Sequence, residues 1–307
     1  MSTPLSGTRF DLSHGDYAAS IASVGATLRS LTHAGRELVV PFDEDVVRPV
    51  FRGATLAPWP NRVVDGRYVF DGVEQQLPLT EPARGHALHG LAAWLDFHAV
   101  DESGDQVTLT TTIAPQAGYP FRIEVTVTFE LDDDGLHTTV TGTNSGPTPA
   151  PWGTGPHPYL VAGDGHVDDW TLTLPAERVL TVTDDRLIPT GLKDVDSESD
   201  GVFDFRAGRR IGQTFIDHAF TRLMRDADGT ASVRLTVADG TGVAISWAAD
   251  CPWVQVHTAD QDDPQISRIG LAVEPMTCPP DAFNSGIDLL VLQPGASTTA
   301  GWTIAAI

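Results

Sequence analysis

The chain has 307 residues, 41% of them hydrophobic, and no apolar run approaches the ~18 residues that a membrane-spanning helix needs. Its formal net charge of −22, from 41 acidic and 19 basic residues, repels polyanions and argues against nucleic acid or an anionic membrane as a partner. The N-terminus lacks a charged start followed by an apolar segment, so we expect no secretory signal, a cytoplasmic protein, and Cys251 and Cys278 as reduced, buried thiols.

Alternation of apolar and polar residues with period two predicts half-buried strands at 124–129, 171–174, 232–237 and 243–247. Turn signals rich in Asp, Asn and Gly stand between such runs, at 70–72, 132–135, 144–146, 226–229 and 239–242. No window shows a helical period, and 29 Gly and 22 Pro would interrupt most candidate helices. No linker or internal repeat divides the chain. We therefore predict an all-β protein in which residues 1–307 form one domain, a single large antiparallel β-sandwich.

Lysine is almost absent, with Lys193 as the only one. It stands in the polar stretch 192–198, which we expect to be a solvated loop. A lysine that forms a Schiff base needs a desolvated pocket that lowers its pKa, so this chemistry is disfavoured. The chain also has no Gly-x-Ser-x-Gly elbow, no Gly-x-x-x-x-Gly-Lys phosphate loop and no dinucleotide-binding fingerprint.

One histidine and one glutamate stand on constrained backbone. His157 lies between Pro156 and Pro158, and proline fixes its own φ and restricts the residue before it. Glu274 precedes Pro275 and follows the apolar run 269–273, where desolvation would raise its pKa toward that of a useful base. The two side chains could relay protons as acid and base. From these segments alone, a satisfied core histidine and an ordinary strand-end carboxylate remain the simpler interpretation.

Two charged residues stand where a β-sheet does not require them. The guanidinium of Arg62, after a Trp-Pro-Asn turn, can bind two sugar hydroxyls or a carboxylate, and the alternative is a surface ion pair. Asp217, between an isoleucine and Phe220, can accept two sugar hydroxyl protons, and the alternative is a turn carboxylate.

His86 and His89 raise the question of a metal site. No third ligand is close in sequence, and the chain has no His-Glu-x-x-His motif and no paired-cysteine motif, so we expect no metal. His89 is better suited to donate a hydrogen bond to a polar ligand, and Gly90 beside it would let a ligand approach the backbone closely.

Taken in order, these motifs resemble those of the aldose 1-epimerase (galactose mutarotase) family, in its broader bacterial branch. The resemblance spans nearly the whole chain, because the segments 25–31 and 68–72 also fit the opening strands of that family. The motifs that carry it are Asn61-Arg62, His89-Gly90, His157-Pro158-Tyr159, Asp217-x-x-Phe220, Glu274 and 280–284.

This resemblance implies a galactose mutarotase-like supersandwich and a reaction without a cofactor, in which the α and β anomers of a free aldohexose such as galactose or glucose interconvert. It implies Glu274 as the general base on the anomeric hydroxyl and His157 as the general acid on the ring oxygen. Arg62, His89 and Asp217 match the sugar-binding positions. Because both groups serve in both directions of the reaction, the pKa of each must lie near the working pH. An ordinary histidine pKa already meets this condition at His157, whereas the pKa of Glu274 must be raised.

Three other functions are weighed against this one. A hexose-6-phosphate mutarotase would need a basic pocket, which one lysine and the acidic balance disfavour. A non-catalytic sugar-binding protein would not require a basic Glu274. A glycoside hydrolase would use Asp217 and Glu274 as paired carboxylates and leave His157 without a role. The mutarotase hypothesis requires His157 and Glu274 to converge on one pocket, and it leaves open which aldose is preferred, since His257 stands where an aromatic residue is commoner.

Overall fold

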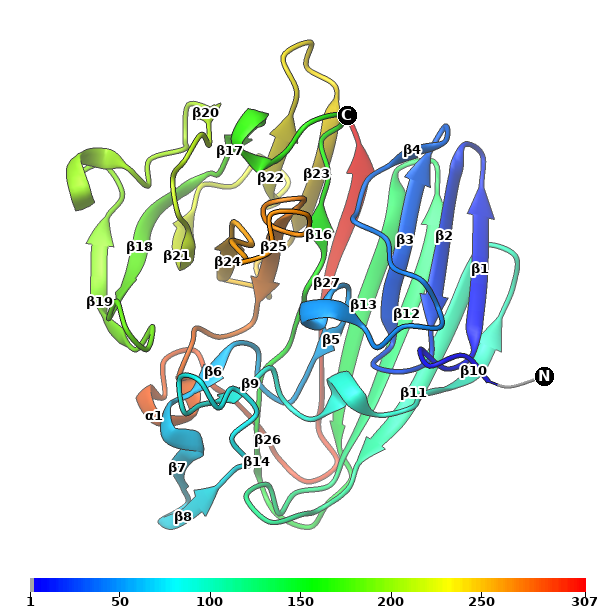
Figure 1. The fold of residues 1–307 in the computed structure, drawn as a ribbon. Helices are drawn as coiled ribbons and strands as arrows, with labels where there is room; N and C mark the ends of the chain where they lie inside the picture. The colour runs from blue at the N-terminus through cyan, green and yellow to red at the C-terminus, as the bar shows by residue number, and fades with distance from the viewer. Residues whose placement is uncertain (1–2) are drawn as a thin grey trace.

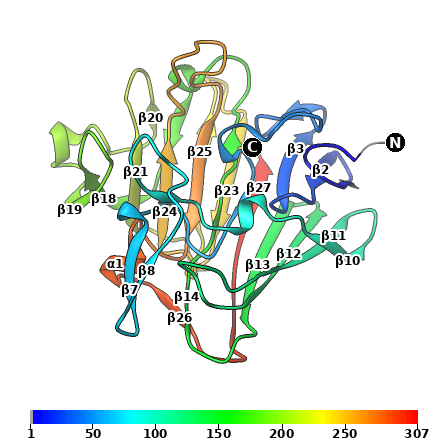
Figure 2. The same ribbon diagram turned by 60° about the horizontal axis from the view of Figure 1, so that its bottom comes forward.

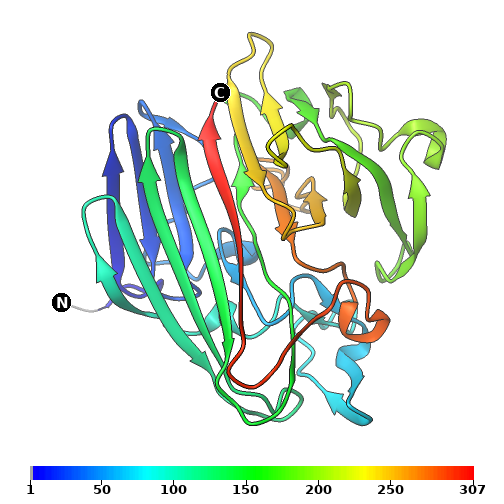
Figure 3. The same cartoon turned by 180° about the vertical axis from the view of Figure 1, so that it is seen from behind.

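The largest sheet has nine strands, and it forms the back of the protein in the computed structural model, which describes residues 3–307 (Figures 1 and 3). Alternation explains its longest strands: in β12, Val125, Val127 and Phe129 are buried, and the threonines between them are partly exposed. In spatial order the strands are β10 (His98–Glu102), β11 (Gln106–Ile113), β12 (Ile123–Asp132), β13 (Gly135–Asn144), β27 (Ser297–Ala306), β23 (Gly242–Trp247), β22 (Ala231–Thr236), β17 (Thr171–Thr173) and β20 (Arg209–Arg210).

A four-stranded antiparallel sheet covers one half of the large sheet (Figure 1). Its first two strands contact β12, so the apolar faces of the two sheets form a sandwich. The strands are β1 (Arg9–His14), β2 (Tyr17–Ala22), β3 (Thr27–His33) and β4 (Arg36–Glu37).

A six-stranded antiparallel sheet lies beside the other half and carries much of the candidate site. Its central strands β24 and β25 are buried almost throughout, which explains why the apolar run before Glu274 does not alternate. The strands are, in spatial order, β16 (Tyr159–Leu160), β25 (Leu271–Met276), β24 (Trp253–His257), β21 (Asp217–Leu223), β18 (Ala176–Val182) and β19 (Pro189–Asp194).

Short ribbons and turns fill one end of the sandwich, where the helix α1 (Ala282–Ser285) lies beside the β7–β8 hairpin (Figure 2). The ribbons are β14 (Ala150–Trp152) with β26 (Leu290–Leu292), β15 (Gly155–Pro156) with β5 (Thr55–Leu56), β6 (Arg62–Val63) with β9 (Ala87–Leu88), and β7 (Arg67–Phe70) with β8 (Val73–Gln76). Short 3-10 turns span Pro49–Phe51, Val64–Gly66, Ala92–Trp94, Val167–Asp169 and Glu198–Gly201.

The architecture confirms the predicted all-β antiparallel class. The predicted strands 124–129 and 243–247 fall within β12 and β23, and those at 171–174 and 232–237 match β17 and β22 but run one residue beyond them. The expected loop at Lys193 is wrong in part, because this residue lies in the edge strand β19. Cys251 and Cys278 are buried free thiols, as expected. None of the described helices is long and apolar enough to cross a membrane. Apolar side chains from all three large sheets form one main buried cluster, and on this basis we propose the single domain of residues 1–307.

Candidate active site

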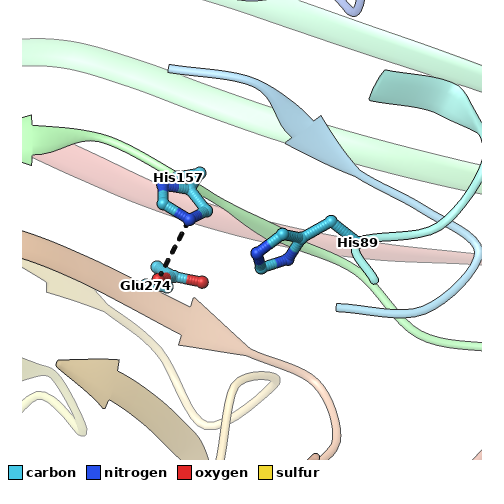
Figure 4. Close-up of side chains that lie close together, drawn as sticks. All are labelled: His89, His157 and Glu274. Carbon is cyan, nitrogen blue, oxygen red and sulfur yellow. Dashed lines mark ion pairs between the residues drawn. The ribbon is translucent and has the colours of Figure 1, made fainter. Parts of the chain in front are cut away.

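The register of β16 and β25 brings His157 and Glu274 together. Tyr159 stands opposite Ala272, and continuing this antiparallel register by two residues places His157 opposite Glu274. Nε2 of His157 lies 3.5 Å from Oε1 of Glu274, and the ring points at the carboxyl group (Figure 4). Both residues are buried, with 4% of His157 and 1% of Glu274 exposed. The convergence that the mutarotase hypothesis requires is therefore present.

The backbone of His157 is fixed on both sides. Its N–H donates to the carbonyl of Ala54 at 3.0 Å, and its carbonyl accepts from the N–H of Gly53 at 2.7 Å. Its ring stacks on the ring of Tyr159 with centroids 5.3 Å apart. The flanking prolines add their restriction of φ. These contacts hold the imidazole in one place relative to Glu274.

Burial sets the protonation of this pair. It lowers the pKa of His157 to about 3, with a further contribution from the charge of His257. Burial also raises the pKa of Glu274 well above its ordinary value, with a contribution from Asp217 and opposed by Arg62. The upward shift expected for Glu274 is present, whereas the expectation that His157 titrates near the working pH is wrong, because burial lowers its pKa to about 3. Both shifts favour the uncharged groups, a protonated carboxyl beside a neutral imidazole, and transfer of that proton within the pair gives a carboxylate beside an imidazolium.

His89 packs edge-on against the ring of His157, with centroids 4.8 Å apart. Burial, followed by the charge of His157, lowers its pKa well below the ordinary value, so it is neutral. Its Nδ1 accepts a hydrogen bond of 3.2 Å from the backbone N–H of Asn61. The proton therefore lies on Nε2, which makes His89 a neutral donor toward a ligand.

The glycine after His89 packs closely against a neighbouring stretch of main chain. A Cβ at Gly90 would lie 2.1 Å from the carbonyl oxygen of Ala57. This neighbouring backbone therefore requires glycine here, and the expected close approach of a ligand to Gly90 stays a prediction.

One trio of possible metal ligands occurs among residues 3–307. Ligand atoms of His89, His157 and Glu274 lie within 4.8 Å of one another. A metal needs an unprotonated ring nitrogen, but the hydrogen bond from Asn61 occupies Nδ1 of His89 and leaves the proton on Nε2. The trio therefore fits a donor beside an acid–base pair better than a metal site. A metal-free and cofactor-free reaction remains a prediction.

Arg62 is held by a carboxylate that the sequence analysis did not identify. Nε and Nη2 of Arg62 donate to the two oxygens of Glu81 at 2.8 and 3.0 Å. Nη2 also lies 3.8 Å from Oδ2 of Asp217. All three side chains are nearly buried, and Glu81 also binds Arg84. No local motif marks Glu81, because the contact comes from the return of the 78–86 segment to β6.

Asp217 is oriented from the neighbouring strand β24. The amide of Gln255 donates a hydrogen bond of 2.6 Å to Oδ1 of Asp217. His257 stands opposite Asp217 in the register, with Nδ1 3.9 Å from Oδ2. Gln255 was not identified from the sequence, since the pairing of β21 with β24 is needed to place it.

All five predicted site residues line one cavity of about 620 Å³, a volume in the usual range for small-molecule sites. The cavity is also lined by Phe51, Asn61, Glu81, Phe215, Gln255 and His257. Two other polar segments lie outside this lining. His86 binds the carbonyl of Arg186, and Asp281 accepts from the N–H of Val64, so both have structural partners.

The comparison that decides the family is a match to the family model described as aldose 1-epimerase, over residues 8–305. The chain belongs to the aldose 1-epimerase family. This membership confirms the resemblance found in the sequence.

The chain is also similar to individual proteins. The chain is 40% identical over 291 residues to the uncharacterized protein YihR of Escherichia coli (strain K12), which covers 94% of this chain and 90% of YihR. It is 28% identical over 241 residues to the galactose mutarotase of Rattus norvegicus, with coverage of 69% and 65%. Among solved structures, a GalM/aldose epimerase homologue from C. elegans superposes with a TM-score of 0.85 at 20% identity and 98% coverage of both chains. At this identity the superposition confirms the galactose mutarotase-like fold.

Proposed function

We propose that this member of the family is an aldose 1-epimerase that interconverts the α and β anomers of a free aldohexose. The observation that carries the proposal is the 3.5 Å approach of His157 to Glu274 inside a cavity lined by hydrogen-bonding groups. A buried pair that can pass one proton between its members is what an acid–base reaction on a neutral sugar needs. The implied partner is a small sugar molecule.

In the proposed reaction, Glu274 acts as a carboxylate and takes the proton of the anomeric hydroxyl. The C1–O5 bond breaks as the imidazolium of His157 gives its proton to the ring oxygen, so the pair again holds one proton in all. Rotation about C1–C2 turns the other face of the aldehyde to O5. Ring closure then runs the same transfers backwards and returns the other anomer.

Arg62, His89 and Asp217 would hold the sugar during these steps. The Nε2–H of His89 lies beside the acid–base pair and suits an oxygen that gains negative charge. Asp217 would accept hydrogen bonds from sugar hydroxyls in an orientation set by Gln255. Arg62 would donate hydrogen bonds to the sugar from a position set by Glu81. Preorganised donors and acceptors of this kind lower the barrier because they need not reorient during the reaction.

A hexose-6-phosphate substrate fits the charges less well. The two arginines that line the cavity, Arg62 and Arg84, both pair with Glu81. Carboxylates of Asp217, Asp260 and Asp262 line the same space and would repel a phosphate. A non-catalytic sugar-binding role gives no reason for a buried acid–base pair, and a glycosidase gives no role to His157.

Polarimetry of freshly dissolved α-glucose and α-galactose near neutral pH tests the proposal. The wild type should accelerate mutarotation of at least one sugar, and Glu274→Gln and His157→Asn should each lose on the order of 10²-fold or more. Matched controls are Glu124→Gln and His98→Asn, which change exposed side chains on β12 and β10. Sugar binding without acceleration in the wild type would favour the non-catalytic alternative, and acceleration only of hexose 6-phosphates would favour the phosphate-specific one.

A further inference from the structure

The wall of the cavity beside the acid–base pair is an aromatic ring that the proposed reaction has not used. Phe51 lines the cavity, and its ring centroid lies 4.8 Å from that of His89 and 6.4 Å from that of His157. We propose that Phe51 is the platform on which the apolar C–H face of the bound pyranose lies, and that it thereby positions C1 and O5 at the acid–base pair. This inference rests on the proposed sugar substrate and adds a binding residue to it.

The backbone that presents Phe51 is in a rare conformation. Val50 and Phe51 both have positive φ, 42° and 57°, which is uncommon for residues other than glycine and especially so for a β-branched one. Such a conformation persists only where the surroundings impose it. Here the hydroxyl of Tyr159 donates to the carbonyl of Val50 at 3.3 Å, and the N–H of Ala54 donates to the carbonyl of Phe51 at 3.0 Å.

The same segment holds His157. Gly53 and Ala54, directly after the Phe51 turn, make the two backbone hydrogen bonds to His157. The phenyl ring and the imidazole are therefore fixed to one another through a single stretch of main chain. A group placed against Phe51 has a defined position relative to the proposed acid.

A second aromatic residue packs against Phe51. The ring of Trp94 lies 5.7 Å from that of Phe51, and the guanidinium of Arg48 lies 4.4 Å from the centroid of the Trp94 ring. Arg48 is itself buried and donates to Thr27 at 2.6 Å and to the carbonyls of Val24 and Ala93. Trp94 is itself 49% exposed, so the anchoring of this wall comes from its contact with the buried Arg48. An anchored side chain loses less entropy when a ligand binds to it.

Sugar chemistry explains why one wall would be aromatic. A pyranose presents hydroxyls around its rim and C–H groups on its faces. The cavity offers charged and amide groups for the rim, among them Arg62, Asp217 and Gln255, and Phe51 is the partly exposed ring next to the acid–base pair. The other partly exposed phenylalanine of the cavity, Phe215, is 50% exposed and carries no ring contact to His89 or His157 among the described residues.

Kinetics of three variants test the platform. Phe51→Leu keeps apolar bulk but loses the flat face, so KM should rise about tenfold with kcat nearly unchanged, because the contact is made equally in ground and transition states. Phe51→Tyr keeps the ring and should retain the wild-type KM. Phe215→Leu removes the more exposed ring and should raise KM less than Phe51→Leu does. Melting temperatures are measured beside the kinetics, and Phe51→Met replaces Phe51→Leu if the latter does not fold.

Two results would overturn the inference: a KM for Phe51→Leu equal to that of the wild type, or an equal rise in Phe51→Leu and Phe51→Tyr. Tryptophan fluorescence separates this failure from failure of the proposed function, because Trp94 contacts the platform and Trp94→Phe identifies its signal. Suppose that sugar changes the fluorescence of the wild type, that Phe51→Leu weakens this change, and that the wild type does not accelerate mutarotation. This result would overturn the proposed function and support the platform. Mutarotation that does not depend on Phe51 would support the proposed function and overturn the platform. A wild type that binds no sugar would overturn both proposals.

Discussion

The amide of Gln255 on β24 and the carboxylate of Asp217 on β21 are joined by a hydrogen bond of 2.6 Å. Gln255 also stands opposite Glu274 in the register of β24 with β25. The buried side chain of Gln255 thus lies between the proposed base, Glu274, and Asp217, which is proposed to bind the sugar. Its amide oxygen is buried and has no hydrogen-bond partner among the described residues, so the side chain is held by its bond to Asp217 at the lining of the cavity.

Replacing Gln255 by Met should therefore weaken sugar binding. A hydrogen bond to a charged group contributes ~1.5–3 kcal/mol, so we expect KM to rise by about tenfold or more. The measurement is KM and kcat by polarimetry, with the exposed Gln265→Met as the matched control. A variant with an unchanged KM would show that Asp217 does not need this partner.

Glu81 should matter as the support of Arg62. Burial acts to raise the pKa of Glu81, but hydrogen bonds and charge from Arg62 and Arg84 outweigh it and hold the pKa below the ordinary value. Because the folded pKa is lowered, the stabilisation is present above the unfolded pKa of ~4.3 and is lost as pH falls through the folded value. Glu81→Ala should lower the Tm at pH 7 by several degrees, roughly 2–4 °C for each kcal/mol lost.

Glu81→Gln separates charge from geometry in this prediction, since the amide oxygen can still accept one hydrogen bond from Arg62. We expect it to retain more stability than Glu81→Ala at pH 7. The difference between wild type and either variant, measured by thermal unfolding, should narrow as the pH approaches 4. A gap that stays constant with pH would mean that the ion pair does not contribute to stability.

Local sequence patterns predicted the parts of the fold that depend on local periodicity. The alternation in 124–129 identifies β12 because only one face of that strand is buried. The two prolines around His157 and the apolar run before Glu274 marked constrained backbone before any register was known. Glu81 and Gln255 were missed because their partners lie 19 and 38 residues away and meet only through sheet pairing. The positive φ of Phe51 was also unpredictable, since the surrounding contacts impose it on a residue that disfavours it.

The acidic surface should make stability depend on salt. The net charge of −22 means that acidic side chains repel one another at low ionic strength. Salt screens this repulsion, since the Debye length falls from ~30 Å at 0.01 M to ~10 Å at 0.1 M salt. We therefore expect the Tm at pH 7 to rise between about 0.01 and 0.5 M KCl, with most of the gain at the lower concentrations. Differential scanning fluorimetry measures this, with sucrose as the uncharged comparison. A Tm that falls with KCl would mean that surface ion pairs outweigh the repulsion.

The pH dependence of the reaction should show how the acid–base pair is tuned. In the proposed reaction the pair works with one proton, so activity should be lost at low pH when a second proton is added to His157. Because burial lowers the pKa of His157 to about 3, this loss should begin well below the range of an ordinary histidine, whose pKa is ~6.5. We expect kcat/KM to stay flat from pH 7 down to about pH 5, where a free histidine would already be charged.

The profile is measured by polarimetry in buffers of constant ionic strength, with the spontaneous rate subtracted at each pH and circular dichroism used to check that the protein stays folded. His257→Gln serves as the comparison, since removing this neighbouring charge should move the acid limb upward in pH. An acid limb of kcat/KM centred near pH 6.5 in the wild type would contradict this prediction, because it would mean that burial does not lower the pKa of His157 in the free enzyme.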